Sequence, residues 1–180
     1  MIRLSPRSTL FPYTTLFRSD LKWEEILSGA STGIVREVES LRQNIEWGHG
    51  ASFNRYDKWG KSVSGTLCEM ALSKKMQSYF SHSVNNFFGK DLIINNKSVQ
   101  VRSQLYSKPN KSLIIRKGFK DEDYYFLVGD DCPTFYFYGY IQAKDCRKCG
   151  KWTDFNQDRP HVWSVPIESL KPITEFINET

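Results

Sequence analysis

Four polar residues have types and spacings suited to phosphodiester chemistry with a divalent cation: Glu69, Asp91, Gln100 and Arg102. Carboxylate and amide oxygens are the ligands that Mg²⁺ prefers, and proteins commonly hold the ion with one or two carboxylates while it keeps several waters. A guanidinium beside such an ion can clamp a phosphate through two hydrogen bonds. We therefore predict that Asp91 and Glu69 bind Mg²⁺, that Gln100 completes or orients the coordination shell, and that Arg102 stabilises the phosphate.

Two helices are predicted ahead of the strands that carry most of these residues. Apolar residues recur every three to four positions over residues 23–43, which predicts a helix with an inward apolar stripe and a charged outer face. Glycines and polar residues predict a loop over residues 48–61, and a second helix is expected over residues 63–77, with Glu69 at its flank. The stripe of the first helix comprises Ile26, Ala30, Ile34, Val38, Leu41 and Ile45.

Beyond the second helix the apolar period changes to two, which is typical of strands. Residues 92–94 and 99–102, joined by a turn at Asn95-Asn96, have the pattern of a hairpin, and alternation places Gln100 and Arg102 on one face. The order of two helices followed by a run of strands, with many aromatic residues in the later strands, predicts an α+β (mixed α/β) fold with an aromatic sheet core. Further strands are expected at residues 113–116, 124–128, 134–142 and 162–165.

At these residues the chain resembles the PD-(D/E)xK nuclease superfamily. Glu69 in GTLCEMALSKKM matches the helix acid and Asp91 the first strand acid, whereas VQVRS carries Gln100 and Arg102 in place of the (D/E)xK element. The resemblance implies a restriction-endonuclease-like central β-sheet flanked by helices and a Mg²⁺-dependent nuclease that acts on DNA. Because glutamine is a neutral ligand, metal binding would depend more on the carboxylates, and arginine can clamp a phosphate but cannot act as a general base.

A longer likeness covers nearly all of residues 20–173. The chain resembles a family of uncharacterised phage and environmental-bacterial proteins that carry the same QVRS strand, through the segments GIVREVESLRQ, GTLCEMALSK, VQVRS, SLIIRKGFKDEDYYFLVGDDCPTFYFYGYIQAKD and HVWSVPIESLKPI. This resemblance implies a nuclease-like fold of viral or mobile-element type, located in the host-cell cytoplasm if phage-encoded, without a demonstrated activity. The alternative is a catalytically inactive module on the same fold that binds nucleic acid or a protein partner.

Nucleic acid is the expected partner, because cations cluster around the segment that follows the QVRS strand and can follow a phosphate backbone. A lysine-rich loop is also compatible with a merely solvated face. No oligomeric state follows from the sequence. The cations are Arg102, Lys108, Lys111, Arg116, Lys117 and Lys120.

The N-terminal segment is set apart, because residues 9–19, TLFPYTTLFRS, match the translation of a widely used DNA-sequencing adapter. We interpret residues 1–19 as non-native and disordered, and residues 20–180 as one domain. Without Arg3, Arg7 and Arg18 the basic residues fall from 25 to 22 against 20 acidic ones, so the net charge falls from +5 to about +2. No apolar run reaches about 18 residues, so no membrane span is predicted.

The cysteines suggest a second metal site. Cys146 and Cys149 have the C-x-x-C-G-K spacing of a zinc knuckle in a loop near the C-terminus, and Cys132 and His161 are the candidates for the two remaining ligands of a structural Zn²⁺ ion. The alternative is an unmetallated thiol pair. Cys68 is interpreted as a buried apolar residue, and four cysteines without a trustworthy secretory signal favour the reducing cytoplasm.

Overall fold

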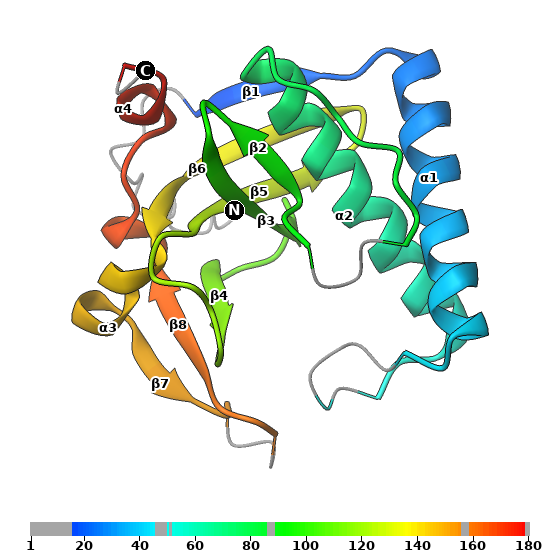
Figure 1. Ribbon diagram of the computed structural model, residues 1–180. Coiled ribbons are helices and arrows are strands. Elements are labelled where there is room, and N and C mark those ends of the chain that lie inside the picture. The colour runs from blue at the N-terminus through cyan, green and yellow to red at the C-terminus, as the bar shows by residue number, and fades with distance from the viewer. Residues whose placement is uncertain (1–15, 46–49, 51, 86–88, 156–158, 179–180) are drawn as a thin grey trace, which may run out of the picture.

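The computed structural model describes residues 16–45, 50, 52–85, 89–155 and 159–178. The predicted mixture of helices and strands is confirmed, and the chain forms a mixed α+β fold (Figure 1). In chain order the helices and strands are β1 (Phe17–Asp20), α1 (Trp23–Arg42), α2 (Arg55–Lys75), β2 (Leu92–Ile94), β3 (Lys97–Leu105), β4 (Ser112–Arg116), β5 (Tyr124–Asp131), β6 (Thr134–Gln142), α3 (Cys146–Cys149), β7 (Lys151–Thr153), β8 (Val162–Pro166) and α4 (Ile173–Asn178).

The elements are stacked in layers, with α1 outermost (Figure 1). α1 packs on α2, and α2 packs on one face of a five-stranded sheet with the order β1-β6-β5-β3-β2. The other face of that sheet packs against a three-stranded sheet with the order β4-β8-β7. Within the larger sheet β3 and β5 are parallel and the other neighbours are antiparallel.

β5 contributes to the cores on both faces of the larger sheet. Phe126 and Val128 lie in the core beneath α2, whereas Tyr125 and Leu127 lie in the core shared with the smaller sheet. A strand that is covered on both faces needs apolar side chains at successive positions, and YYFLV provides them. The ring of Tyr140 on β6 stacks on Phe126 with the centroids 5.3 Å apart, so the predicted aromatic sheet core is confirmed.

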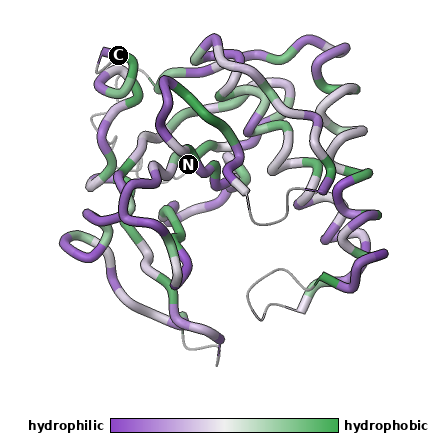
Figure 2. The backbone as a smooth tube through the Cα atoms, viewed as in Figure 1, coloured by the Kyte–Doolittle hydropathy of each residue, from purple (hydrophilic) through white to green (hydrophobic). Residues whose placement is uncertain are grey.

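The hairpin that carries three of the candidate site residues is confirmed. Leu92 pairs with Val99 across β2 and β3. Asn95 and Asn96 have φ values of 51° and 61°, the left-handed region that a tight two-residue hairpin turn requires. Figure 2 shows the contrast between the hydrophobic strand β2 and the hydrophilic turn.

α1 forms over the predicted residues, but the predicted orientation of its faces is wrong. Its buried face is small or polar. Of the predicted apolar stripe, Ile34, Val38 and Leu41 are exposed to solvent, and only Ile26 packs partly against the core. A Cβ atom on Gly33 would lie 2.8 Å from Ser62 O and from Val63 Cα, so the two helix backbones are in contact there. Larger apolar side chains cannot fit into such an interface. The buried residues are Gly29, Thr32, Gly33, Glu37 and Ser40.

α2 begins at Arg55 and not at residue 63, which is about two turns earlier than expected. The side chain of Asn54 accepts a hydrogen bond from the backbone N–H of Asp57 at 2.9 Å and so caps the helix. The predicted loop is therefore wrong over residues 55–61, which are helical. Residues 46–49 and 51 of that predicted loop lie outside the described residues.

The predicted disorder of residues 1–19 is wrong at its C-terminal end. Residues 17–19 belong to β1, which pairs antiparallel with β6, and Ser19 lies opposite Phe135. This edge strand adds backbone hydrogen bonds to a sheet whose neighbouring strand is rich in buried aromatic residues. Residues 1–15 lie outside the described residues.

The contact between the helix backbones predicts an asymmetric response to alanine. Gly33→Ala adds a methyl group that collides with the backbone of α2, so it should lower the free energy of unfolding by about 1–3 kcal/mol. Gly60→Ala is the matched control, because a Cβ atom at this helical position meets nothing within 4 Å and should stabilise α2 by about 0.5–1 kcal/mol. Urea denaturation measures both. Equal effects of the two substitutions would contradict the contact.

Candidate functional site

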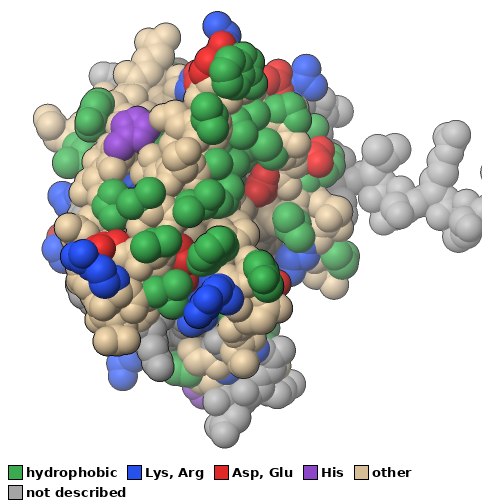
Figure 3. Space-filling model, turned by 90° about the vertical axis from the view of Figure 1, so that its right-hand side faces the viewer, with side chains coloured by type: hydrophobic (Ala, Val, Ile, Leu, Met, Phe, Trp, Pro, Cys, Tyr) green, Lys and Arg blue, Asp and Glu red, His purple; other side chains and the backbone are tan. Residues whose placement is uncertain are grey.

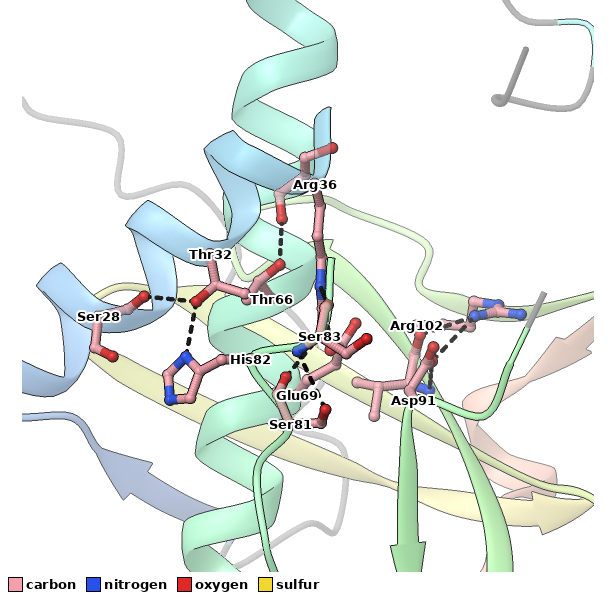
Figure 4. Close-up of polar contacts among 12 residues, drawn as sticks. Ser28, Thr32, Arg36, Thr66, Glu69, Ser81, His82, Ser83, Asp91 and Arg102 are labelled. Carbon is pink, nitrogen blue, oxygen red and sulfur yellow. Dashed lines mark hydrogen bonds and ion pairs between the residues drawn. The ribbon is translucent and has the colours of Figure 1, made fainter. Parts of the chain in front are cut away.

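Glu69, Asp91 and Arg102 meet at the junction of α2 with the β2–β3 hairpin (Figure 4). Glu69 lies on the side of α2 that faces α1, and Asp91 immediately precedes β2. An additional residue, Arg36 of α1, reaches into the same junction. Three elements that are distant in the sequence therefore contribute charged groups to one place.

Asp91 closes the end of the hairpin ladder. The last pair on this side is Leu92 with Val99, and the Asp91 carboxylate then accepts the backbone N–H of Val101 through Oδ2 at 2.7 Å. Nη1 of Arg102 lies 3.7 Å from the same oxygen. The backbone hydrogen bond fixes the direction of the carboxylate, so its position depends on the register of the hairpin.

Glu69 is held by Arg36, a residue that the sequence patterns alone did not single out. Nη1 of Arg36 lies 2.7 Å from Oε2 of Glu69, and the Glu69 side chain is only 12% exposed. The same guanidinium donates to the backbone carbonyls of Ser83 and Ser81, at 2.9 and 3.0 Å. Arg36 therefore ties α1 to the carboxylate and to the segment that leads from α2 towards Asp91. The one sequence feature that could have pointed to Arg36 is its place among the small and polar residues of one face of α1.

The two carboxyl groups have raised pKa values. Burial is the largest cause for Glu69, followed by repulsion from Asp91, and together they raise its pKa to about 7 against the opposing attraction of Arg36. Burial also raises the pKa of Asp91, while Arg102 and the Val101 N–H oppose the rise. At neutral pH Glu69 therefore keeps part of a proton that an ordinary surface carboxyl group would lose.

Gln100 and Arg102 emerge on the face of β3 that turns away from α2, because they alternate with Val99 and Val101, which belong to the core beneath α2. Arg102 nonetheless reaches Asp91, with its guanidinium lying 5.1 Å from the centroid of the Tyr125 ring. Nε2 of Gln100 donates to Gly89 O at 3.4 Å. Gln100 therefore contacts the segment before Asp91 and lies beside the charged cluster.

The donor set fits a hard divalent cation held by few protein ligands. Among the described residues, the hydrogen bonds and ion pairs of the two carboxylates run through Oε2 of Glu69 and Oδ2 of Asp91, which leaves Oε1 and Oδ1 for a ligand. No group of three or more His, Cys, Asp or Glu side chains within the described ranges is arranged to hold a metal ion. A pair of carboxylates with water and substrate oxygens is a usual arrangement for Mg²⁺.

The other predicted phosphate-binding cations do not form one cluster. Arg116 is close enough to Arg102 for their repulsion, added to burial, to lower its pKa. Lys108 and Lys111 lie before β4, at the opposite end of that strand from Arg116 and Lys117, and Nζ of Lys111 donates to Lys108 O at 2.8 Å. Of these four, Arg116 is the one with an interaction that reaches Arg102 beside the carboxylate site.

The cysteine pair adopts a helical turn instead of the predicted knuckle. Cys146 is fully buried at the start of α3, and burial raises its pKa to about 11, which disfavours the thiolate form that binds metal. Cys132 lies at the other end of β6, roughly 25 Å away at the usual rise per residue. The ring of His161 stacks on Trp152. Among the described residues, the four predicted zinc ligands are thus not gathered around one point.

No protein-family model matches the chain, and comparisons with curated proteins and with solved structures gave no match either. Within the described residues no helix has both the length and the apolar character needed to cross a membrane. The functional interpretation therefore rests on the geometry and electrostatics of the site.

The raised pKa of Glu69 predicts a pH dependence of stability. Its ordinary pKa is 4.5, so between about pH 4.5 and 7 the unfolded chain loses this proton while the folded chain keeps it, and the stability contributed by the protonated group is lost as the pH rises. The free energy of unfolding of the wild type relative to Glu69→Gln should fall by about 3 kcal/mol between pH 4.5 and 8. Denaturant titrations of both proteins measure this difference. A difference that is constant or increases with pH would contradict the assignment.

Proposed function

We propose that the chain is a Mg²⁺-dependent phosphodiesterase that cleaves DNA, with Glu69 and Asp91 as the metal ligands. The observation that carries the proposal is the proximity of these two poorly hydrated carboxyl groups: burial, followed by repulsion from Asp91, raises the pKa of Glu69. A divalent cation between them would replace the missing hydration and cancel the repulsion. Among the described residues, Oε1 of Glu69 and Oδ1 of Asp91 take part in no hydrogen bond or ion pair, so they offer the ion one ligand from each residue.

The groups around the carboxylates suit a phosphodiester substrate. When bound, Mg²⁺ would polarise a phosphoryl oxygen and lower the barrier to attack by water. Arg102 would pair with the non-bridging phosphate oxygens, and Arg116 nearby would extend the cationic surface along the backbone. Arg36 keeps Glu69 directed at the site, and Gln100 orients the segment before Asp91 through Gly89.

Within the mixed α+β architecture, we propose that the chain has a restriction-endonuclease-like arrangement. Supporting it are an acid directly before the first hairpin strand, the Gln100 and Arg102 pair on the second strand, and an acid on the helix packed beside them. One feature departs from a sheet flanked by helices, because the face opposite α2 packs against the smaller sheet. The proposed likeness is therefore centred on α2 and the β2–β3 hairpin.

Asp91→Asn should abolish cleavage while preserving the fold and the binding of DNA. We expect the rate of Mg²⁺-dependent cleavage to fall by at least about 100-fold, because the amide keeps the shape of the side chain but removes a charged ligand. Asp121→Asn is the control, because Asp121 is an exposed carboxylate whose ion pair with Arg147 is 56% exposed on both sides. Assays on labelled single-stranded DNA, double-stranded DNA and RNA give the rates and the preferred substrate. Cleavage by Asp91→Asn at the wild-type rate would refute the proposal.

A non-catalytic phosphate-binding module is the second candidate. Arg36 and Arg102 already pair with the two carboxylates without a metal. Burial, with repulsion from Arg102, lowers the pKa of Arg116, so an anion bound beside these two arginines would relieve their repulsion. This candidate predicts DNA binding without turnover in Mg²⁺ or Mn²⁺. Arg116→Gln should then weaken binding and reduce the slope of log K against log salt by about one. Salt titration by fluorescence anisotropy separates this outcome from the catalytic one.

A further inference from the structure

The solvent-facing side of α1 carries an apolar stripe along the length of the helix. Figure 3 shows this side of the molecule, with hydrophobic side chains gathered across it. The most exposed are Trp23 and Leu27, at 69% and 59%, and four more apolar side chains are at least 40% exposed. These are Ile34, Val35, Val38 and Leu41. The helix is the outermost layer, so within the described residues no other element packs over the stripe.

The spacing within the stripe is that of a helix that pairs with another helix. Leu27, Ser31, Ile34, Val38 and Leu41 follow one another at alternating steps of four and three residues. This alternation keeps a narrow seam on one side of a helix and is the pattern of a two-helix coiled coil. Packing against α2 uses the opposite face, which is small and polar, so the seam is not an extension of the protein core.

The size of the stripe matches a protein interface. At these exposures the six apolar side chains present on the order of 600 Å² of surface, at the upper limit of what monomers usually leave in one patch. A stable interface buries about 800 Å² on each partner, which the stripe and its polar margins together approach.

We propose that α1 pairs antiparallel with α1 of a second copy of this chain, with Trp23 opposite Arg42 of that copy. In this register the two helices overlap over their full length, Leu27 faces Val38, and Ile34 faces Ser31. A parallel pair would instead bring identical charged ends together.

The charges at the ends of α1 favour the antiparallel arrangement. Glu24 lies in the first turn beside Glu25, which already pairs with Lys74 at 2.7 Å. Arg42 lies in the last turn, where its 77% exposed side chain also contacts Glu39 at 3.1 Å. An antiparallel copy places Glu24 of each helix beside the exposed Arg42 of the other, and it also opposes the two helix dipoles. The seam itself contains no charged side chain between Leu27 and Leu41.

The oligomeric state tests the proposal first. Sedimentation velocity of the wild type at about 50 µM should give about 42 kDa, twice the 21.0 kDa of one chain. Leu27→Lys should weaken self-association at least tenfold, whereas Ile93→Lys should not change it, although the Ile93 side chain on β2 is also 59% exposed. A monomeric wild type, as expected if another segment or another protein covers the stripe, would overturn the proposal. An equal effect of both lysines would do so too.

Mixing two variants tests the register. Val38→Glu alone should also dissociate the dimer. An equimolar mixture of Leu27→Lys and Val38→Glu should form a heterodimer. In the proposed register residue 27 of each copy faces residue 38 of the other, so the introduced lysine meets the introduced glutamate at one of these two contacts. Parallel pairing would place these two introduced charges about 16 Å apart along the axis, and no rescue would occur. Matching circular dichroism and melting temperatures for the variants show that they fold. Failure of the mixture to associate would overturn the antiparallel register.

Discussion

Two carboxylates that share a poorly hydrated junction impose the constraint on which the proposed site depends. Burial makes both carboxyl groups harder to ionise, Asp91 adds repulsion at Glu69, and the structure offsets that penalty with one arginine beside each of them, Arg36 and Arg102. Such an arrangement is unfavourable if it serves stability alone, since burying charged pairs often contributes little net free energy. It suits a site in which a bound metal ion would displace the proton of Glu69 and take over the pairing of the carboxylates from Arg36 and Arg102. The proposed chemistry follows from that exchange.

The same constraint explains the unusual orientation of α1. For Arg36 to reach Glu69, α1 must lie close to α2, and Gly33 permits the backbones to touch one turn away from Arg36. The face of α1 that is turned inward is therefore small and polar, and Glu37 within it accepts a hydrogen bond from Ser62. Most of the large apolar residues of the helix are left on the outside. This close packing of α1 on α2 thus creates both the charged junction and the exposed seam proposed for self-association.

Local features of the fold could be predicted because they depend on neighbours in the sequence. The β2–β3 hairpin follows from alternating residues around Asn95 and Asn96, and the proximity of Asp91 to Arg102 follows from the register of that hairpin. Periodicity indicated which residues of α1 share a face but not which face is buried, because that depends on the close approach of α2. For the same reason Arg36 could not be identified from the sequence. The spacing of Cys146 and Cys149 suits a metal knuckle and a helical turn equally, and only the packing of Cys146 distinguishes them.

Calorimetry of Mn²⁺ or Mg²⁺ binding at pH 7, repeated in buffers with different ionisation enthalpies, tests the central claim most directly. Because the pKa of Glu69 is about 7, a cation that binds there must displace about half a proton per site, and this release should vanish near pH 9 and in Glu69→Gln. Binding of one cation with that proton release would support the assignment of Glu69 and Asp91 as ligands. Absence of binding, or the same proton release from Glu69→Gln, would contradict it.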